Sequence, residues 1–133
     1  MADRSASDFV RGVPSLGQPI VHFEIIGKDT NKAKKFYGDL FGWKIGDVMG
    51  PEMGNYALVD GESSGVAGGL GEGQNGETRV TVYAQVPDPQ ATLDKATQMG
   101  GKVLMPPTEI PGGNVTLAMF ADPDGNVIGL TKG

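Results

Sequence analysis

The stretch VHFEIIGKDTNKAKKFYGDLFGWKI, residues 21–45, joins a strand pattern to a helix pattern with very little between them. In its first part, β-branched and aromatic residues alternate with two polar residues, His22 and Glu24. Successive side chains of a strand point to opposite faces, so this alternation predicts a strand over 20–26. One face of that strand is apolar, and the other presents an imidazole and a carboxylate.

The helix expected after this strand has both of its ends marked in the sequence. Asp29 or Thr30 can cap its N-terminus, and Gly42 can end it. Between these ends the apolar residues follow the i, i+3, i+4, i+7 spacing of one buried stripe. The residues of this stripe are Ala33, Phe36, Tyr37, Leu40 and Phe41.

The same order of patterns returns after the polar stretch 71–78. Residues 79–86 alternate as a strand, Asp88 and Pro89 can begin a helix, and Gly100 with Gly101 can end it. Further strands are expected at 43–48, 55–60 and 65–70 in the first half, and at 102–105, 114–121 and 126–131 in the second. Residues 105–113 are expected to form a long loop.

A nearly constant separation relates the two halves of the chain. Asp29 and Asp88 are 59 residues apart, and Gly69 and Gly129 are 60 residues apart. A strand, a helix and three strands repeated at a fixed separation indicate an internal duplication. Two such half-domains, each with one sheet face covered by a helix, bring their other faces together and create a cleft suited to a ligand.

Composition excludes several classes of partner and chemistry. The 133 residues suit one domain, with a net charge of -5 and no basic run longer than 32–35, so neither a nucleic acid nor an anionic membrane is expected as a partner. No apolar run approaches the roughly 20 residues that span a bilayer. The absence of cysteine excludes disulfides and thiolate sites. Residues 1–17 are polar and aperiodic, so a flexible arm is expected there. They also lack the apolar core of a secretory signal, so a cytoplasmic location is expected.

The quoted stretch and FADPDGNVIGL, residues 120–130, resemble the vicinal-oxygen-chelate superfamily, which includes glyoxalase I, extradiol dioxygenases and bleomycin-resistance proteins. The shared pattern is a strand histidine, an aspartate seven residues later, a helix with Phe-Tyr and Leu-Phe-Gly, and an Asp-Pro-Asp-Gly-Asn turn before the final strand. The resemblance covers residues 19–131.

The resemblance implies an α+β fold in which paired β-α-β-β-β modules form a curved mixed sheet around a central cleft. We expect one glyoxalase-like domain over 18–133, with module one at 19–70, a linker at 71–78 and module two at 79–131. A homodimer, formed by side-to-side association or by exchange of modules, is left open.

The family's metalloenzymes hold a divalent ion through the first and last strands of each module. The matching positions are His22, Gly69, Thr81 and Gly129, of which only His22 is a good ligand. These enzymes usually carry a glutamate where Gly129 stands. No cofactor is therefore expected, and the alternative is a divalent metal held weakly at His22.

The candidate ligand-binding residues lie on the expected cleft face or at its mouth. They are His22, Glu24, Thr81, Tyr83, Gln85 and Met105. His22 is interpreted either as a base or ligand anchor with a near-neutral pKa or as a hydrogen-bonded remnant of a metal site. Glu24 either orients His22 or lies solvated at the rim. Met105, in the expected loop, is placed at the mouth with Met49 and Met53 because methionine adapts to irregular apolar ligands.

Three functions follow from these interpretations. The first is metal-free binding of a small organic molecule, as in the drug-resistance branch of the family. The second is a glyoxalase-like lyase or an isomerase, with His22 and Glu24 as catalytic acid and base or as part of an incomplete metal site. The third is a dimeric scaffold whose cleft is closed.

Overall fold

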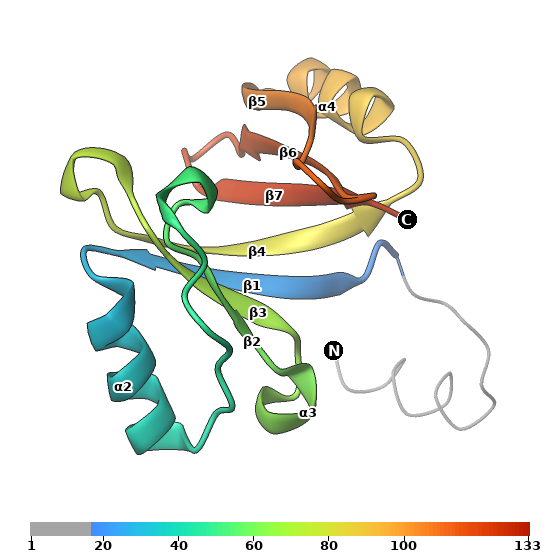
Figure 1. Ribbon diagram of the computed structural model, residues 1–133. Helices are drawn as coiled ribbons and strands as arrows, with labels where there is room; N and C mark the ends of the chain where they lie inside the picture. Colours follow the sequence, from blue (N-terminus) through green and yellow to red (C-terminus); the bar gives the residue numbers. More distant parts are fainter. Residues whose placement is uncertain (1–16) are drawn as a thin grey trace, which may run out of the picture.

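The computed structural model describes residues 17–133, so all but the last residue of the predicted arm 1–17 lies outside the described residues. Seven strands form one sheet in the order β2-β3-β1-β4-β7-β6-β5 (Figure 1). The strands are β1 (Ile20–Gly27), β2 (Ala57–Val59), β3 (Gly68–Glu72), β4 (Arg79–Val86), β5 (Lys102–Glu109), β6 (Thr116–Ala121) and β7 (Val127–Lys132).

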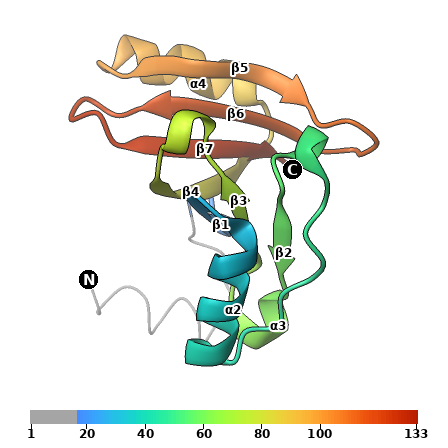
Figure 2. The same ribbon diagram turned by 60° about the vertical axis from the view of Figure 1, so that its left-hand side comes forward.

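The pairing of the strands repeats about the centre of the sheet. β1 and β4 pair antiparallel with each other, and each pairs in parallel with the last strand of its own half, β3 or β7. Antiparallel pairs then extend each half outward. Figure 2 shows the two halves turned against each other, so that the sheet curves. The predicted α+β fold of paired modules in a curved mixed sheet is confirmed.

Both main helices begin, and the first one ends, at residues that the sequence marks, whereas the second helix ends at Gln98, before the predicted Gly100 and Gly101. Asp29 accepts a hydrogen bond from the backbone N–H of Lys32 at the start of α2 (Thr30–Phe41), and Gly42 ends this helix with φ 72°. Asp88 caps α4 (Pro89–Gln98) in the same way. A short helix, α3 (Gly61–Ser64), precedes β3. Within residues 17–133 no helix is long and apolar enough to cross a membrane.

The core is better formed in the second half than in the first. Leu93 of α4 is fully buried with Val86, Ala118 and Leu130 of the sheet. The buried stripe predicted for α2 is wrong in part, because Phe36, Leu40 and Phe41 are each more than half exposed. The first half offers this helix a narrower sheet, since the strand predicted over 43–48 forms only one bridge, between Ile45 and Val59.

The loop predicted over 105–113 is also corrected, because β5 continues through Pro106 and Pro107 to Glu109. β5 is the outermost strand of its half and pairs only with β6, so its prolines need no second hydrogen-bonded neighbour. The pairing shifts register on both sides of Met105, and these irregularities absorb the missing N–H donors.

Candidate functional site

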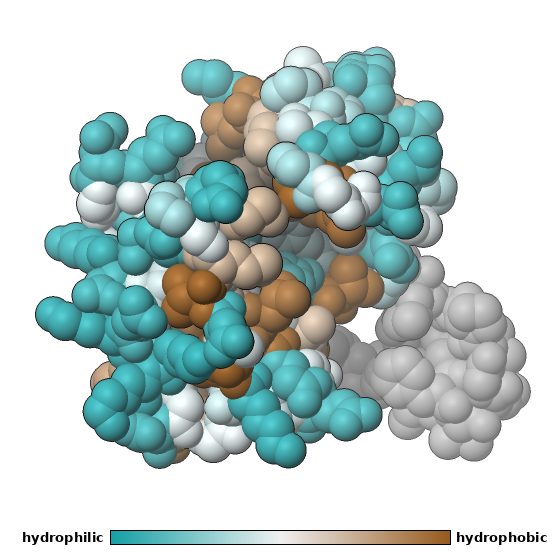
Figure 3. Space-filling view, in the orientation of Figure 1, coloured by the Kyte–Doolittle hydropathy of each residue, from teal (hydrophilic) through white to brown (hydrophobic). Residues whose placement is uncertain are grey.

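A cavity of about 500 Å³ lies between the two halves on the concave side of the sheet. In Figure 3, hydrophobic residues gather around a hollow between two more hydrophilic flanks. Its size falls within the range of small-molecule sites, and most of its lining is apolar. The lining residues are Val21, His22, Glu24, Met49, Met53, Tyr56, Leu58, Tyr83, Gln85, Ile110, Val115, Leu117 and Thr131.

Four of the six predicted ligand-binding residues line this cavity, namely His22, Glu24, Tyr83 and Gln85. Thr81 and Met105 do not. Thr81 is 2% exposed and lies beside Arg79, whose Nη1 is 3.5 Å from the threonine Oγ1. Met105 belongs to the outermost strand, β5, rather than to a loop at the mouth of the cleft, whereas the expected rim residues Met49 and Met53 do line the cavity.

One lining residue departs from the predicted alternation of β1. Val21 was expected on the apolar face, opposite His22, yet both line the cavity. The register of β1 against β4 shifts between Ile20 and His22. Such an irregularity changes the direction in which neighbouring side chains point, and a sequence pattern of period two cannot include it.

Tyr56 is the main residue of the site that the sequence analysis missed. Ala57 pairs with Leu70, so the preceding Tyr56 lies beside the next residues of β3. A Cβ atom at Gly69 would meet the ring and hydroxyl of Tyr56, and one at Gly71 would come within 2.8 Å of its Cδ1. Two glycines at alternate positions of a strand leave one face bare, and that spacing is the signal that an aromatic ring covers it.

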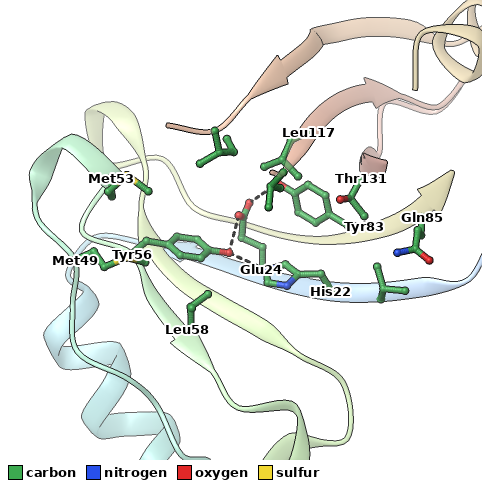
Figure 4. A pocket seen from close by; sticks show the side chains of 13 residues that line it. His22, Glu24, Met49, Met53, Tyr56, Leu58, Tyr83, Gln85, Leu117 and Thr131 are labelled. Carbon is green, nitrogen blue, oxygen red and sulfur yellow. Dashed lines mark hydrogen bonds between the residues drawn. The ribbon is translucent and has the colours of Figure 1, made fainter. Parts of the chain in front are cut away.

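Glu24 is the centre of a hydrogen-bond network that joins both halves (Figure 4). Its Oε1 accepts from Arg79 Nη1 at 2.9 Å and from the Tyr83 hydroxyl at 3.2 Å, while its Oε2 accepts from the Tyr56 hydroxyl at 3.0 Å. The carboxylate side chain is 10% exposed and forms an ion pair with Arg79. Both oxygens therefore have partners within the protein, as a buried charge requires.

The two tyrosines of this network remain hydrogen-bond donors. Burial, followed by the nearby charge of Glu24, raises the pKa of Tyr56 and of Tyr83 well above the ordinary value for a phenol. Loss of either proton would place a second negative charge beside the buried carboxylate. The hydroxyls therefore stabilise Glu24 and do not act as bases.

His22 is connected to Glu24 through Tyr56 and not directly. Its Nε2 lies 2.9 Å from the Tyr56 hydroxyl, and its ring meets the edge of the Tyr83 ring with centroids 5.6 Å apart. Burial lowers the pKa of His22, and the charge of Glu24 opposes this shift. At neutral pH the imidazole is therefore uncharged, with a lone pair on one of its nitrogens.

The residues at the four metal positions do not fit the ion that the resemblance implies. The rings of Tyr56 and Tyr83 occupy the space that side chains at Gly69 and Gly129 would need. Thr81 lies outside the cavity, and the oxygens of Glu24 already accept hydrogen bonds. Within residues 17–133 no group of three or more His, Cys, Asp or Glu residues could hold a metal ion.

Comparison with known proteins places this chain in a family. The sequence profile of the "Glyoxalase/Bleomycin resistance protein/Dioxygenase superfamily" matches residues 19–130. The chain belongs to this superfamily. Among curated members, "Putative glyoxylase CFP32" of Mycobacterium bovis and of Mycobacterium tuberculosis are each 34% identical over 107 residues. The match covers 77% of this chain and 41% of each relative, so the chain spans about two fifths of their length.

Several solved structures share the fold at low sequence identity. Methylmalonyl-CoA epimerase from Mycobacterium tuberculosis is similar with a TM-score of 0.63 and 17% identity, over 85% of this chain and 86% of that one. The hypothetical protein BH1468 from Bacillus halodurans has a TM-score of 0.65 and 13% identity, over 89% and 96% of the two chains. At these identities the similarity concerns the fold.

Proposed function

We propose that this superfamily member binds a small, largely apolar organic molecule in the cavity and does so without the family's catalytic metal. The observation that carries the proposal is the pair of tyrosine rings over Gly69 and Gly129. They fill the ligand positions of a metalloenzyme, yet a cavity of about 500 Å³ remains beside them.

The lining supports apolar burial as the main source of affinity. Met49, Met53, Leu58 and Leu117 form much of the wall, and methionine side chains adapt to irregular apolar surfaces. Burial of apolar ligand surface contributes about 25 cal/mol per Å², less the cost of immobilising the ligand. The few polar lining groups, His22 among them, then orient the molecule.

The test measures binding of a neutral apolar probe, indole, to protein treated with EDTA, by calorimetry or by NMR titration. Indole should bind with an affinity that added Zn²⁺, Ni²⁺, Fe²⁺ or Mn²⁺ leaves unchanged. Leu117→Trp fills the cavity and should abolish binding. Leu104→Trp makes the same change on β5, outside the cavity lining, and should retain it. A saturable, metal-dependent turnover would overturn the proposal.

A second candidate is an enzyme that uses His22 as a general base. The lowered pKa of His22 and its link to Glu24 through Tyr56 favour this role, because the imidazole is uncharged and oriented. Glu24 suits base chemistry less well, since both of its oxygens accept hydrogen bonds. His22→Ala distinguishes the two candidates: an enzyme should lose turnover by orders of magnitude, and a binding protein should lose only modest affinity.

The third interpretation, a scaffold with a closed cleft, is not supported by the described residues. It required that no pocket lie between the two halves, and a cavity lined by residues of both halves is present.

A further inference from the structure

We propose that the cavity selects molecules that offer a neutral N–H or O–H donor to His22 Nδ1, because Tyr56 and Glu24 fix the His22 proton on Nε2. The ligand class rests on the proposed function, whereas the position of the proton does not. The polar groups involved are drawn in Figure 4, with His22 and Tyr56 meeting above β1.

A count of protons at the Tyr56 hydroxyl assigns the direction of each hydrogen bond. The hydroxyl has one proton and two close partners, Glu24 Oε2 at 3.0 Å and His22 Nε2 at 2.9 Å. If the proton went to His22, the hydroxyl oxygen would face a carboxylate oxygen at 3.0 Å with no hydrogen between them. The hydroxyl therefore donates to Glu24, and Nε2–H of His22 donates to the hydroxyl oxygen.

The ion pair with Arg79 makes this direction the stable one. Arg79 Nη1 forms an ion pair with Glu24 Oε1 at 2.9 Å, and an ionised carboxylate acts only as an acceptor. In a neutral imidazole with its proton on Nε2, Nδ1 has a lone pair. The structure gives Nδ1 no partner within residues 17–133, and the His22 side chain lines the cavity.

The remaining lining groups favour a neutral donor over an anion. Apart from His22, none of the lining residues is basic, and the charge of Arg79 is already paired with Glu24. An anionic ligand would enter beside a buried carboxylate without a cation of its own. Gln85 and Thr131, which pair across β4 and β7, add an amide and a hydroxyl at the same end of the cavity (Figure 4).

The position of the proton can be measured directly, because His22 is the only histidine of the chain. A long-range ¹H–¹⁵N correlation spectrum of the uniformly labelled protein at neutral pH should show a pyrrole-type Nε2 and a pyridine-type Nδ1. A pyrrole-type Nδ1 would overturn the assignment. This result is independent of any ligand.

Two matched tyrosine variants separate the role of Tyr56 from a general loss of hydroxyls. Tyr56→Phe removes the acceptor of Nε2–H, and both ring nitrogens should then share the proton. Tyr83→Phe removes another hydroxyl that donates to Glu24, but the Tyr83 hydroxyl makes no hydrogen bond to His22. The Nε2–H form should therefore persist in this variant. Equal spectra for the two variants would contradict the proposed role of Tyr56. A residue with a purely structural role would not change which nitrogen of His22 carries the proton.

The ligand class is tested with indole and 1-methylindole, which differ by one N–H donor. One neutral hydrogen bond is worth about five-fold in affinity, and burial of the extra methyl group of 1-methylindole offsets part of it, so indole should bind more tightly by up to about five-fold. The preference should persist in Tyr83→Phe and fall in Tyr56→Phe. Equal affinities in the unsubstituted protein would overturn the donor rule. Binding of neither compound would overturn the proposed function, and the proton assignment would then stand or fall on its own spectrum.

Discussion

Replacement of Gly129 by alanine is expected to lower the free energy of unfolding by about 2 kcal/mol. A Cβ atom at this position would lie 2.7 Å from Cγ of Tyr83 and closer still to two other ring atoms. Ordinary contact begins at 3.4 Å, so the ring has to retreat by about 0.7 Å or more. Tyr83 is only 2% exposed, and little space is open to it.

Three contributions make up this magnitude. Overpacking of a buried side chain costs about 2 kcal/mol. Displacement of the ring breaks the 3.2 Å hydrogen bond from the Tyr83 hydroxyl to Glu24, which costs about 1 kcal/mol. Alanine also lowers the conformational entropy of the unfolded chain, which offsets somewhat less than 1 kcal/mol of this cost. For a chain of this size the sum corresponds to a fall in Tm of roughly 6–10 °C.

Urea unfolding followed by far-UV circular dichroism measures the effect, and two comparisons test its cause. Gly27→Ala makes the same change at the end of β1, where nothing lies within 4 Å of the new Cβ, so it should raise the free energy of unfolding by somewhat less than 1 kcal/mol. In a Tyr83→Ala background the cost of Gly129→Ala should nearly vanish, which gives a coupling of at least about 1 kcal/mol. An effect equal to that of Gly27→Ala, or a cost unchanged without the ring, would refute the reasoning.

Three further predictions concern buried polar groups. Thr30→Val should raise the free energy of unfolding by about 1 kcal/mol in urea titrations, because Thr30 Oγ1 is buried without a hydrogen-bond partner within residues 17–133; a loss of stability would contradict this. Glu24→Gln should lower it by about 2 kcal/mol, because Arg79 loses its counter-ion while its side chain, 27% exposed, keeps some contact with water. Because burial lowers the pKa of His22, the unfolded chain binds the proton more readily than the folded one. Stability should therefore fall as the pH drops below about 6.5 and level off below the folded pKa, and His22→Asn should lack this component.

The parts of the fold that depend on local chemistry could be predicted from the sequence. Caps and stops act within a few residues, so Asp29, Gly42 and Asp88 mark the helix ends correctly. The edges of the sheet could not be predicted, because a strand exists only where a distant strand pairs with it. Residues 43–48 have a strand pattern but only one bridging partner, and 105–109 contain two prolines yet pair with β6.

The candidate site shows the same division. Period-two alternation is sufficient to place His22 and Glu24 together on the cavity side. It cannot place Val21, which depends on an irregular register, or Tyr56, which reaches the site from the segment just before β2. The direct contact suggested between Glu24 and His22 is replaced by one through the Tyr56 hydroxyl. A sequence pattern gives the face of a strand, but the partner of a polar atom depends on three-dimensional packing.

The duplication explains why the glycines and the tyrosines belong to one structural change. Glu24 and Tyr83 are equivalent positions in the two halves, 59 residues apart, and each lies beside the glycine of its own last strand, Gly69 or Gly129. Tyr83 covers its glycine with its own ring. Glu24 cannot, and Tyr56, which directly precedes β2, covers Gly69 instead. The carboxylate of Glu24 then accepts a hydrogen bond from one tyrosine hydroxyl of each half.

A side chain at either glycine would displace one of these donors and leave the buried charge less well paired. The glycines at the family's ligand positions are therefore required by the Glu24 network, and restoring a metal ligand there would mean removing the tyrosine that now fills the space.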